Sequence, residues 1–224
     1  MKVCTDACIQ GAYAAKRLSE SGKAFKNVLD IGTGTGLLTL MLAQKNSYLR
    51  FDAIELNNSA YLQAKENIAH STWAKNISVI HGDIRNLPLS GKYDFIICNP
   101  PFYEDEAKSN KPHKNQSKHS IDLSHLELKD CIIGNLSENG TACVMLPEKQ
   151  FAWFKQLMEK DSYQAIHLLK VRQTPVQSGF RIIGFFNKNI HHGTIEELCI
   201  CSMNGKYSRE FKAFLKDYYL YLDA

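Results

Sequence analysis

The sequence predicts an α/β protein in which helices cover both faces of a mostly parallel sheet. Short strand-like runs alternate with stretches of helical periodicity, as in repeated strand–helix units. A glycine-rich turn separates the first run from the helix after it. The 224 residues are 44% hydrophobic and 22% charged, which suits a globular protein of one large domain or two small ones. We expect residues 1–224 to form a single domain.

Seven runs have the composition and length of strands. They are residues 27–31, 51–55, 77–81, 93–98, 141–146, 165–171 and 180–187. We expect them to form a seven-stranded, mostly parallel sheet with an antiparallel last strand. The runs at 165–171 and 180–187 would supply the final pair.

Helices are predicted where apolar residues recur at helical spacing. One begins directly after the glycine turn, over residues 37–43. Three further sets each share one helical face: Tyr61, Ala64 and Ile68; Phe151, Phe154, Leu157 and Met158; and Phe211, Phe214, Leu215, Tyr218, Tyr219 and Leu222. The last set could stack bases, but such a stripe is far more often the buried face of an amphipathic helix.

Composition narrows the function classes. The net charge of +4 permits a nucleic-acid partner without requiring one. No run approaches the roughly 18 to 20 apolar residues of a membrane span. The N-terminal segment has Asp6 and two cysteines where a secretory signal needs apolar residues, so we expect a cytoplasmic protein without membrane contact. The seven cysteines form no CxxC pair and no zinc-ligand spacing, which predicts reduced thiols and no metal.

A glycine-rich turn follows the first predicted strand, in the sequence NVLDIGTGTG at residues 27–36. Glycine lets the backbone approach a ligand closely, and the helix start offers N–H groups, so the turn predicts a nucleotide-type site. The spacing of Gly32, Gly34 and Gly36 is GxGxG, whereas dinucleotide sites have GxGxxG. Asp30 ends the strand, and its carboxylate would repel a pyrophosphate but suits an ammonium group. S-adenosylmethionine (SAM) has that group and no phosphate.

Acidic residues also mark the ends of the next two strands. Glu55 is placed to accept hydrogen bonds from ribose hydroxyls. Asp83 could accept from an adenine amine, with Leu56 and Ile84 clamping the ring. The segments DIGTGTG, IEL and GDI together resemble the cofactor half of the class I SAM-dependent methyltransferases, over residues 27–98. The resemblance implies a Rossmann-like fold with SAM as cofactor.

The tetrapeptide Asn99-Pro100-Pro101-Phe102 follows the fourth predicted strand. The two prolines fix the backbone and remove two N–H donors, which leaves the Asn99 amide oxygen and the Pro100 carbonyl as rigid acceptors. Two such acceptors suit an exocyclic NH₂ group. Holding both hydrogens out of the ring plane favours the tetrahedral nitrogen that attacks a methyl carbon. Phe102 offers a face on which a flipped base can stack.

This tetrapeptide resembles the (N/D)PP(Y/F) motif of methyltransferases that act on planar amino groups. Those enzymes modify DNA adenine, RNA adenine, RNA guanine or protein glutamine. The resemblance implies that residues 99–102 are the catalytic motif, with Asn99 also contacting the cofactor.

The first residues, MKVCTD followed by GAY, resemble the MKVGTD…GAW stretch of the bacterial tRNA1(Val) adenine-N6 methyltransferase family. The resemblance continues through LDIGTGTGLLTLMLAQ, NPPF, Lys118–His119 and a tail at 207–220, and Cys4 stands where the family usually has glycine. It implies that residues 1–26 cover the methionine end of SAM, with Thr5 and Asp6 in the cofactor site. It also implies N6-methylation of adenine 37, beside the anticodon of a valine tRNA.

Residues 103–122 break the strand–helix alternation and predict a substrate loop. Its basic side chains include Lys108, Lys111, Lys114, Lys118 and His119. Such residues beside a base pocket can neutralise phosphates and position an RNA strand. The alternative interpretation is an ordinary solvated loop.

Three other functions remain open. A protein glutamine-N5 methyltransferase of release factors shares the pocket chemistry, but that family usually has Tyr after NPP and an N-terminal helical domain. Another RNA or DNA amino-methyltransferase is possible, although DNA adenine enzymes usually carry an added recognition domain. A non-catalytic RNA-binding protein with a relict Rossmann-like domain is disfavoured by the intact turn, Glu55, Asp83 and NPPF. We expect direct methyl transfer by a monomer.

Overall fold

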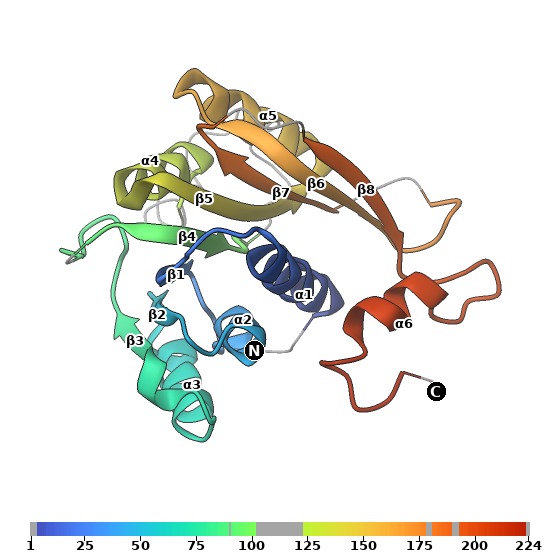
Figure 1. Ribbon diagram of the computed structural model, residues 1–224, viewed down its shortest axis with the longest axis horizontal. Coiled ribbons are helices and arrows are strands. Elements are labelled where there is room, and N and C mark those ends of the chain that lie inside the picture. The colour runs from blue at the N-terminus through green and yellow to red at the C-terminus, as the bar shows by residue number, and fades with distance from the viewer. Residues whose placement is uncertain (1–3, 90, 102–122, 178–180, 190–192, 223–224) are drawn as a thin grey trace, which may run out of the picture.

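A computed structural model describes residues 4–89, 91–101, 123–177, 181–189 and 193–222, and its centre is a mixed sheet (Figure 1). The eight strands have the spatial order β3-β2-β1-β4-β5-β7-β6-β8. Their bounds are β1 Asn27–Ile31, β2 Arg50–Glu55, β3 Ile77–His81, β4 Tyr93–Cys98, β5 Leu136–Pro147, β6 Gln164–Arg172, β7 Arg181–Asn187 and β8 Thr194–Cys199. Strand β7 runs antiparallel to both of its neighbours, and the other pairings are parallel.

The predicted fold class is confirmed, and the strand count was one too low. The additional strand is β8, which pairs with β6 at the edge of the sheet. Half of its residues are exposed, and the sequence TIEELC lacks the apolar alternation by which a strand is recognised. The predicted antiparallel last strand is β7, which lies between β5 and β6.

Helices cover both faces of the sheet, as predicted. They are α1 Thr5–Glu20, α2 Leu37–Lys45, α3 Asn58–Ala69, α4 His125–Asn135, α5 Glu148–Lys160 and α6 Arg209–Leu215, with a 3₁₀ turn, η1, at Ala74–Asn76. One apolar core joins the sheet to α1, α2 and α6, and a second joins its other face to α4 and α5. Figure 1 shows these helices as two layers on either side of the strands.

Helix α1 fills most of the segment that was expected to cover the cofactor. Its buried residues include Gly11, where an added Cβ would lie 2.7 Å from the Met41 sulfur of α2. The glycine therefore allows the two helices to approach closely. At the other end of the chain, the predicted aromatic stripe is only partly helical: α6 ends at Leu215, and Tyr218 and Tyr219 pack on the same core from the turn that follows.

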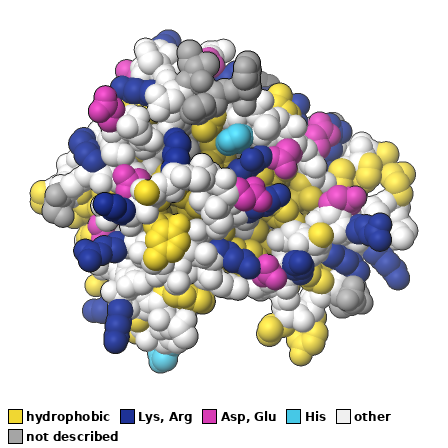
Figure 2. Space-filling model, in the orientation of Figure 1, with side chains coloured by type: hydrophobic (Ala, Val, Ile, Leu, Met, Phe, Trp, Pro, Cys, Tyr) yellow, Lys and Arg dark blue, Asp and Glu magenta, His cyan; other side chains and the backbone are white. Residues whose placement is uncertain are grey.

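Among the described residues, no helix has both the length and the apolar character needed to cross a membrane. On the face drawn in Figure 2, Lys and Arg side chains are interspersed with Asp and Glu side chains.

Candidate active site

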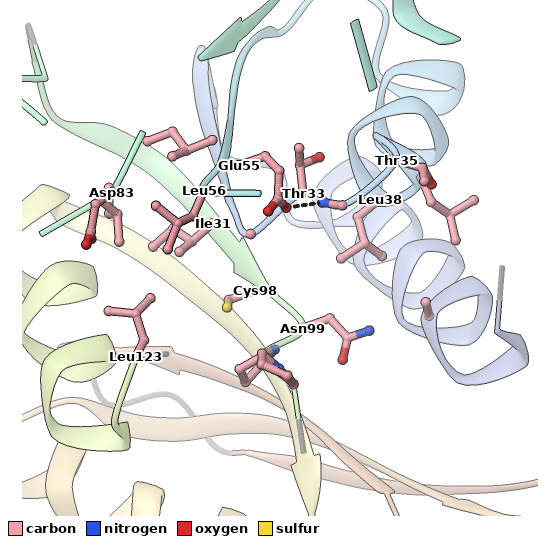
Figure 3. A pocket seen from close by; sticks show the side chains of 18 of the residues that line it. Ile31, Thr33, Thr35, Leu38, Glu55, Leu56, Asp83, Cys98, Asn99 and Leu123 are labelled. Atoms are coloured by element: carbon pink, nitrogen blue, oxygen red, sulfur yellow. Dashed lines mark hydrogen bonds between the residues drawn. The ribbon is translucent and has the colours of Figure 1, made fainter. Parts of the chain in front are cut away.

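A cavity of about 400 Å³ opens at the carboxyl ends of β1, β2, β3 and β4. The beginning of α1 and the residue before the N-cap of α4 complete its wall. Figure 3 shows Asp83 and Leu123 on one side of the cavity and Asn99 on the other, with Glu55 above the centre. The motifs that are far apart in the sequence therefore meet at one edge of the sheet.

Most of the residues predicted for the site and described by the structure line this cavity. They are Gly32, Gly34, Glu55, Leu56, Asp83, Ile84, Asn99, Pro100 and Pro101. The wall also contains residues that sequence reasoning missed: Cys4, Ala7, Ile31, Thr33, Thr35, Leu37, Leu38, Ile54, Gly82, Cys98 and Leu123. Several of these residues are next to a motif residue in the sequence, and this adjacency is the signal that could have predicted them. The predicted residues Phe102, Lys108, Lys111, Lys114, Lys118 and His119 lie outside the described residues.

The backbone N–H groups of the glycine turn donate hydrogen bonds to other groups of the protein. Gly32, Gly34 and Gly36 have φ of 71°, 60° and 85°, a region that glycine adopts without strain. The amides of Gly32 and Thr33 both donate to the Ile54 carbonyl at 2.9 Å, and the amide of Gly34 donates to Glu55 Oε2 at 2.8 Å. A phosphate cradle presents such amides to its ligand. In this turn, three backbone amides instead donate to residues of β2, which favours a ligand without a phosphate here. Gly36 caps α2 and is not on the cavity wall.

Glu55 is held in place by two backbone amides. The residue is 9% exposed, Oε2 accepts from Gly34, and Oε1 accepts from the amide of Asn57 at 2.8 Å. A carboxylate has about four acceptor positions, so capacity remains after these two hydrogen bonds. Glu55 is therefore a fixed acceptor on the cavity wall, suited to hydroxyl groups.

Asp83 is anchored by Arg85. Arg85 Nε lies 2.9 Å from each carboxylate oxygen, and Nη2 lies 2.6 Å from Oδ2. The same guanidinium donates to Glu127 of α4 at 3.1 Å, so it links the end of β3 to that helix. The hydrogen bond from Arg85 holds the pKa of Asp83 below its ordinary value. Asp83 thus stays an ionised acceptor at the cavity.

Asp30 lies beneath the glycine turn and is not on the cavity wall. It is 1% exposed, and Oδ2 accepts from the hydroxyls of Thr33 and Thr39, both at 2.7 Å. Burial raises its pKa to about 6. Oδ1 is buried and has no partner within the described part of the chain. Asp30 therefore supports the turn from below, and its contact with an ammonium group stays a prediction.

Asn99 presents an acceptor without a donor. It follows the last residue of β4, and its Oδ1 is buried with no hydrogen-bond partner among the described residues. Pro100 is buried and Pro101 is exposed. Buried amide oxygens are rarely left unpaired, and unpaired ones concentrate where a ligand or water completes the site. The acceptor that sequence reasoning assigned to a target amine is therefore present at the cavity.

The start of α1 contributes to the cavity wall, and the cofactor contacts of Thr5 and Asp6 stay predictions. Thr5 and Asp6 are not on the cavity wall, whereas Cys4 and Ala7 are. Asp6 Oδ2 instead lies 3.5 Å from Nε of Arg181, at the start of β7. This ion pair joins two segments 175 positions apart, which no local pattern could predict.

Comparisons with known proteins identify the family of this chain. Residues 13–120 match the model of the methyltransferase small domain. A tRNA1(Val) (adenine(37)-N6)-methyltransferase from Proteus mirabilis is 32% identical over 99% of this chain and 88% of its own length. One of the same name from Flavobacterium psychrophilum is also 32% identical, over 98% and 93%. The chain belongs to this family.

Solved structures show the same fold. A protein from Agrobacterium tumefaciens predicted to be an O-methyltransferase superposes with a TM-score of 0.66 at 13% identity, over 94% of this chain and 93% of its own. A Listeria monocytogenes protein assigned to the class I SAM-dependent methyltransferases gives 0.65 at 14% identity, over 88% and 68%. This member of the family is accordingly a methyltransferase with SAM as its cofactor. Within the described ranges, no group of three or more His, Cys, Asp or Glu side chains could hold a metal ion.

Proposed function

We propose that the protein transfers a methyl group from SAM to N6 of adenine 37 in tRNA1(Val), in the cytoplasm. The observation that carries the proposal is the Oδ1 of Asn99, which is buried at the cavity wall and has no hydrogen-bond partner among the described residues. The names of the relatives, which match along nearly the whole chain, supply the tRNA and the position.

The cavity residues fit the parts of SAM. Glu55 would accept from the ribose hydroxyls and Asp83 from the adenine amine, with Leu56 and Ile84 against the ring. The turn whose amides are bonded to β2 suits a cofactor without phosphate. When bound, SAM supplies a methyl group on a positively charged sulfur. The protein's part is to hold the target nitrogen where it can attack.

Asn99 and Pro100 hold that nitrogen in our mechanism. The lone pair of an exocyclic amine is delocalised into the ring, which makes the nitrogen a weak nucleophile. Two fixed acceptors, Asn99 Oδ1 and the Pro100 carbonyl, would bind both amine hydrogens and favour the tetrahedral geometry of the transition state. The excess proton leaves the nitrogen after methyl transfer. Phe102 would stack on the base, as expected from the motif.

Basic side chains beyond Asn99 suit an RNA partner. Arg181 begins β7 beside Pro147, the last residue of β5, and its side chain is 36% exposed. Arg172 ends β6, with 30% of its side chain exposed. Both lie at the carboxyl edge on the side of β4 away from the cofactor cavity. Arginines there can contact phosphates and fix the orientation of a tRNA. From the sequence alone, Lys108, Lys111, Lys114 and Lys118 are further candidates for contact with RNA phosphates.

Labelled SAM tests the function. The protein is incubated with total tRNA in one reaction and with a release-factor substrate in another, and the tRNA is digested to nucleosides. We expect label in N6-methyladenosine from tRNA alone. Label in N2-methylguanosine, or in a release-factor glutamine with none in tRNA, would reject the proposed substrate.

A further inference from the structure

Gln10 places a polar side chain inside an otherwise apolar layer. It lies in the second turn of α1 with 0% exposure, on a helix whose buried positions are otherwise mostly small or apolar. A buried amide loses its hydration, and it needs hydrogen bonds in return. The partners of Gln10 therefore indicate what the residue does.

Only one half of this amide has a strong partner. Nε2 donates to the carbonyl oxygen of Cys98 at 2.9 Å and lies 3.9 Å from the sulfur of Cys143, a weak acceptor. Oε1 is buried, and the described residues offer it no partner. An apolar side chain of similar size would avoid the desolvation of that oxygen. The contact with Cys98, and not packing, distinguishes Gln10 from such a residue.

The Cys98 carbonyl controls the direction in which Asn99 leaves the strand. Cys98 is the last residue of β4, and its carbonyl shares one planar peptide group with the N–H of Asn99. The next two residues, Pro100 and Pro101, have no N–H and cannot continue the strand pairing as donors. The hydrogen bond from Gln10 therefore fixes the peptide plane at the point where the sheet stops fixing it.

We infer that Gln10 is a positioning residue, whose amide holds the Cys98 peptide so that Asn99 Oδ1 is aimed at the target amine. The inference rests on the proposed function, because Gln10 acts through Asn99. Ala7, three residues earlier on α1, lines the cofactor cavity. One helix thus contacts both the cofactor site and the peptide that precedes Asn99.

Two variants of α1 test this role. Gln10→Met keeps the side-chain length and removes the donor. Tyr13→Phe is the matched control, because it removes another hydrogen bond of the same helix, from the Tyr13 hydroxyl to Glu196 at 2.9 Å, and leaves the bond to the Cys98 peptide in place. We expect Gln10→Met to lower kcat by about 10- to 100-fold, since small misplacements in an active site cost up to about 100-fold. The Kd for SAM should not rise and the Tm should not fall, and Tyr13→Phe should leave kcat unchanged.

A double-mutant cycle separates positioning from a general structural role. In the Asn99→Ala background, Gln10→Met should cause no further loss of kcat. An unchanged kcat in the single variant, or losses that multiply in the double variant, would overturn the inference. If Gln10→Met does not fold, Gln10→Leu, which also lacks a donor, takes its place in the cycle. Absence of tRNA methylation by the unaltered protein would instead reject the proposed function.

Discussion

The carboxyl edge of the sheet has two halves that are built differently. In the cofactor half, at the ends of β1 to β3, the carboxylates are held by protein donors: Glu55 by two backbone amides and Asp83 by Arg85. In the substrate half, which begins at the end of β4, Asn99 Oδ1 is buried without a partner among the described residues. The carboxylates that the first half presents on the cavity wall are therefore fixed by the protein itself. The second keeps its acceptor for the substrate.

Replacing Asn99 should produce the largest loss of kcat. A small loss would show that the two halves of the edge do not differ in the way described. Asn99→Ala removes the acceptor of the substrate half, and the loss of one preorganised polar contact costs about 10²–10³ in kcat. SAM should still bind, as measured by titration calorimetry. Asn76→Ala, at the opposite end of β3, is the control and should leave kcat unchanged. Near wild-type turnover in Asn99→Ala would contradict the mechanism.

Glu55 tests the cofactor half. Glu55→Ala leaves donors of the ligand and the amides of Gly34 and Asn57 without their acceptor, which costs roughly 1–3 kcal/mol, or about 5- to 150-fold in the Kd for SAM. Calorimetry measures the change. Glu66→Ala, on the exposed surface of α3, should not alter the Kd. Unchanged SAM affinity in Glu55→Ala would remove this residue from the cofactor site.

Arg181 tests the RNA side of the substrate half. Arg181→Ala should weaken tRNA binding and reduce the slope of log K against log salt by about 0.7 to 0.9, the value for one lost phosphate contact. The Kd for SAM should not change. Arg50→Ala, an exposed arginine at the opposite edge of the sheet, is the matched control. Equal salt slopes for the two variants would show that Arg181 does not contact the tRNA backbone.

The raised pKa of Asp30, in the cofactor half, predicts how the free energy of unfolding depends on pH. Burial raises its pKa from 3.8 to about 6, so the folded state favours the protonated form. The free energy of unfolding should therefore fall as the pH rises from about 4 to above 6, by at most about 3 kcal/mol. Asp30→Asn should flatten this dependence and raise the Tm at pH 8. Thermal unfolding of both proteins from pH 4 to 8 measures it, and identical profiles would contradict the prediction.

The cofactor half was predictable because each of its parts has a local signature. The glycine turn after β1, Glu55 at the end of β2 and Asp83 after β3 are each recognisable from a few neighbouring residues, and the alternation of strands and helices brings these strand ends together. Their presence on the cavity wall followed from the fold class. Their roles in binding stay predictions.

The parts that sequence reasoning missed depend on contacts between distant segments. The buried residues of helix α1 lie on nearly all of its sides, and many of them are small. The sequence therefore shows no stripe of large apolar residues that would predict this helix. An acid at a strand end can turn toward the ligand or beneath the turn, and the hydroxyls of Thr33 and Thr39 show that Asp30 does the latter. The burial of Gln10 Oε1 without a partner in the described ranges, and the pairing of Asp6 with Arg181, likewise arise from tertiary packing.

Methyl transfer to tRNA1(Val) transcripts that differ only at position 37 tests the central claim most directly. One transcript carries adenosine, and the other carries inosine, in which an oxygen replaces the exocyclic amine that Asn99 and Pro100 are proposed to hold. We predict one methyl group per adenosine transcript, recovered as N6-methyladenosine at position 37, and none on the inosine transcript. Equal methylation of the two transcripts would contradict the account.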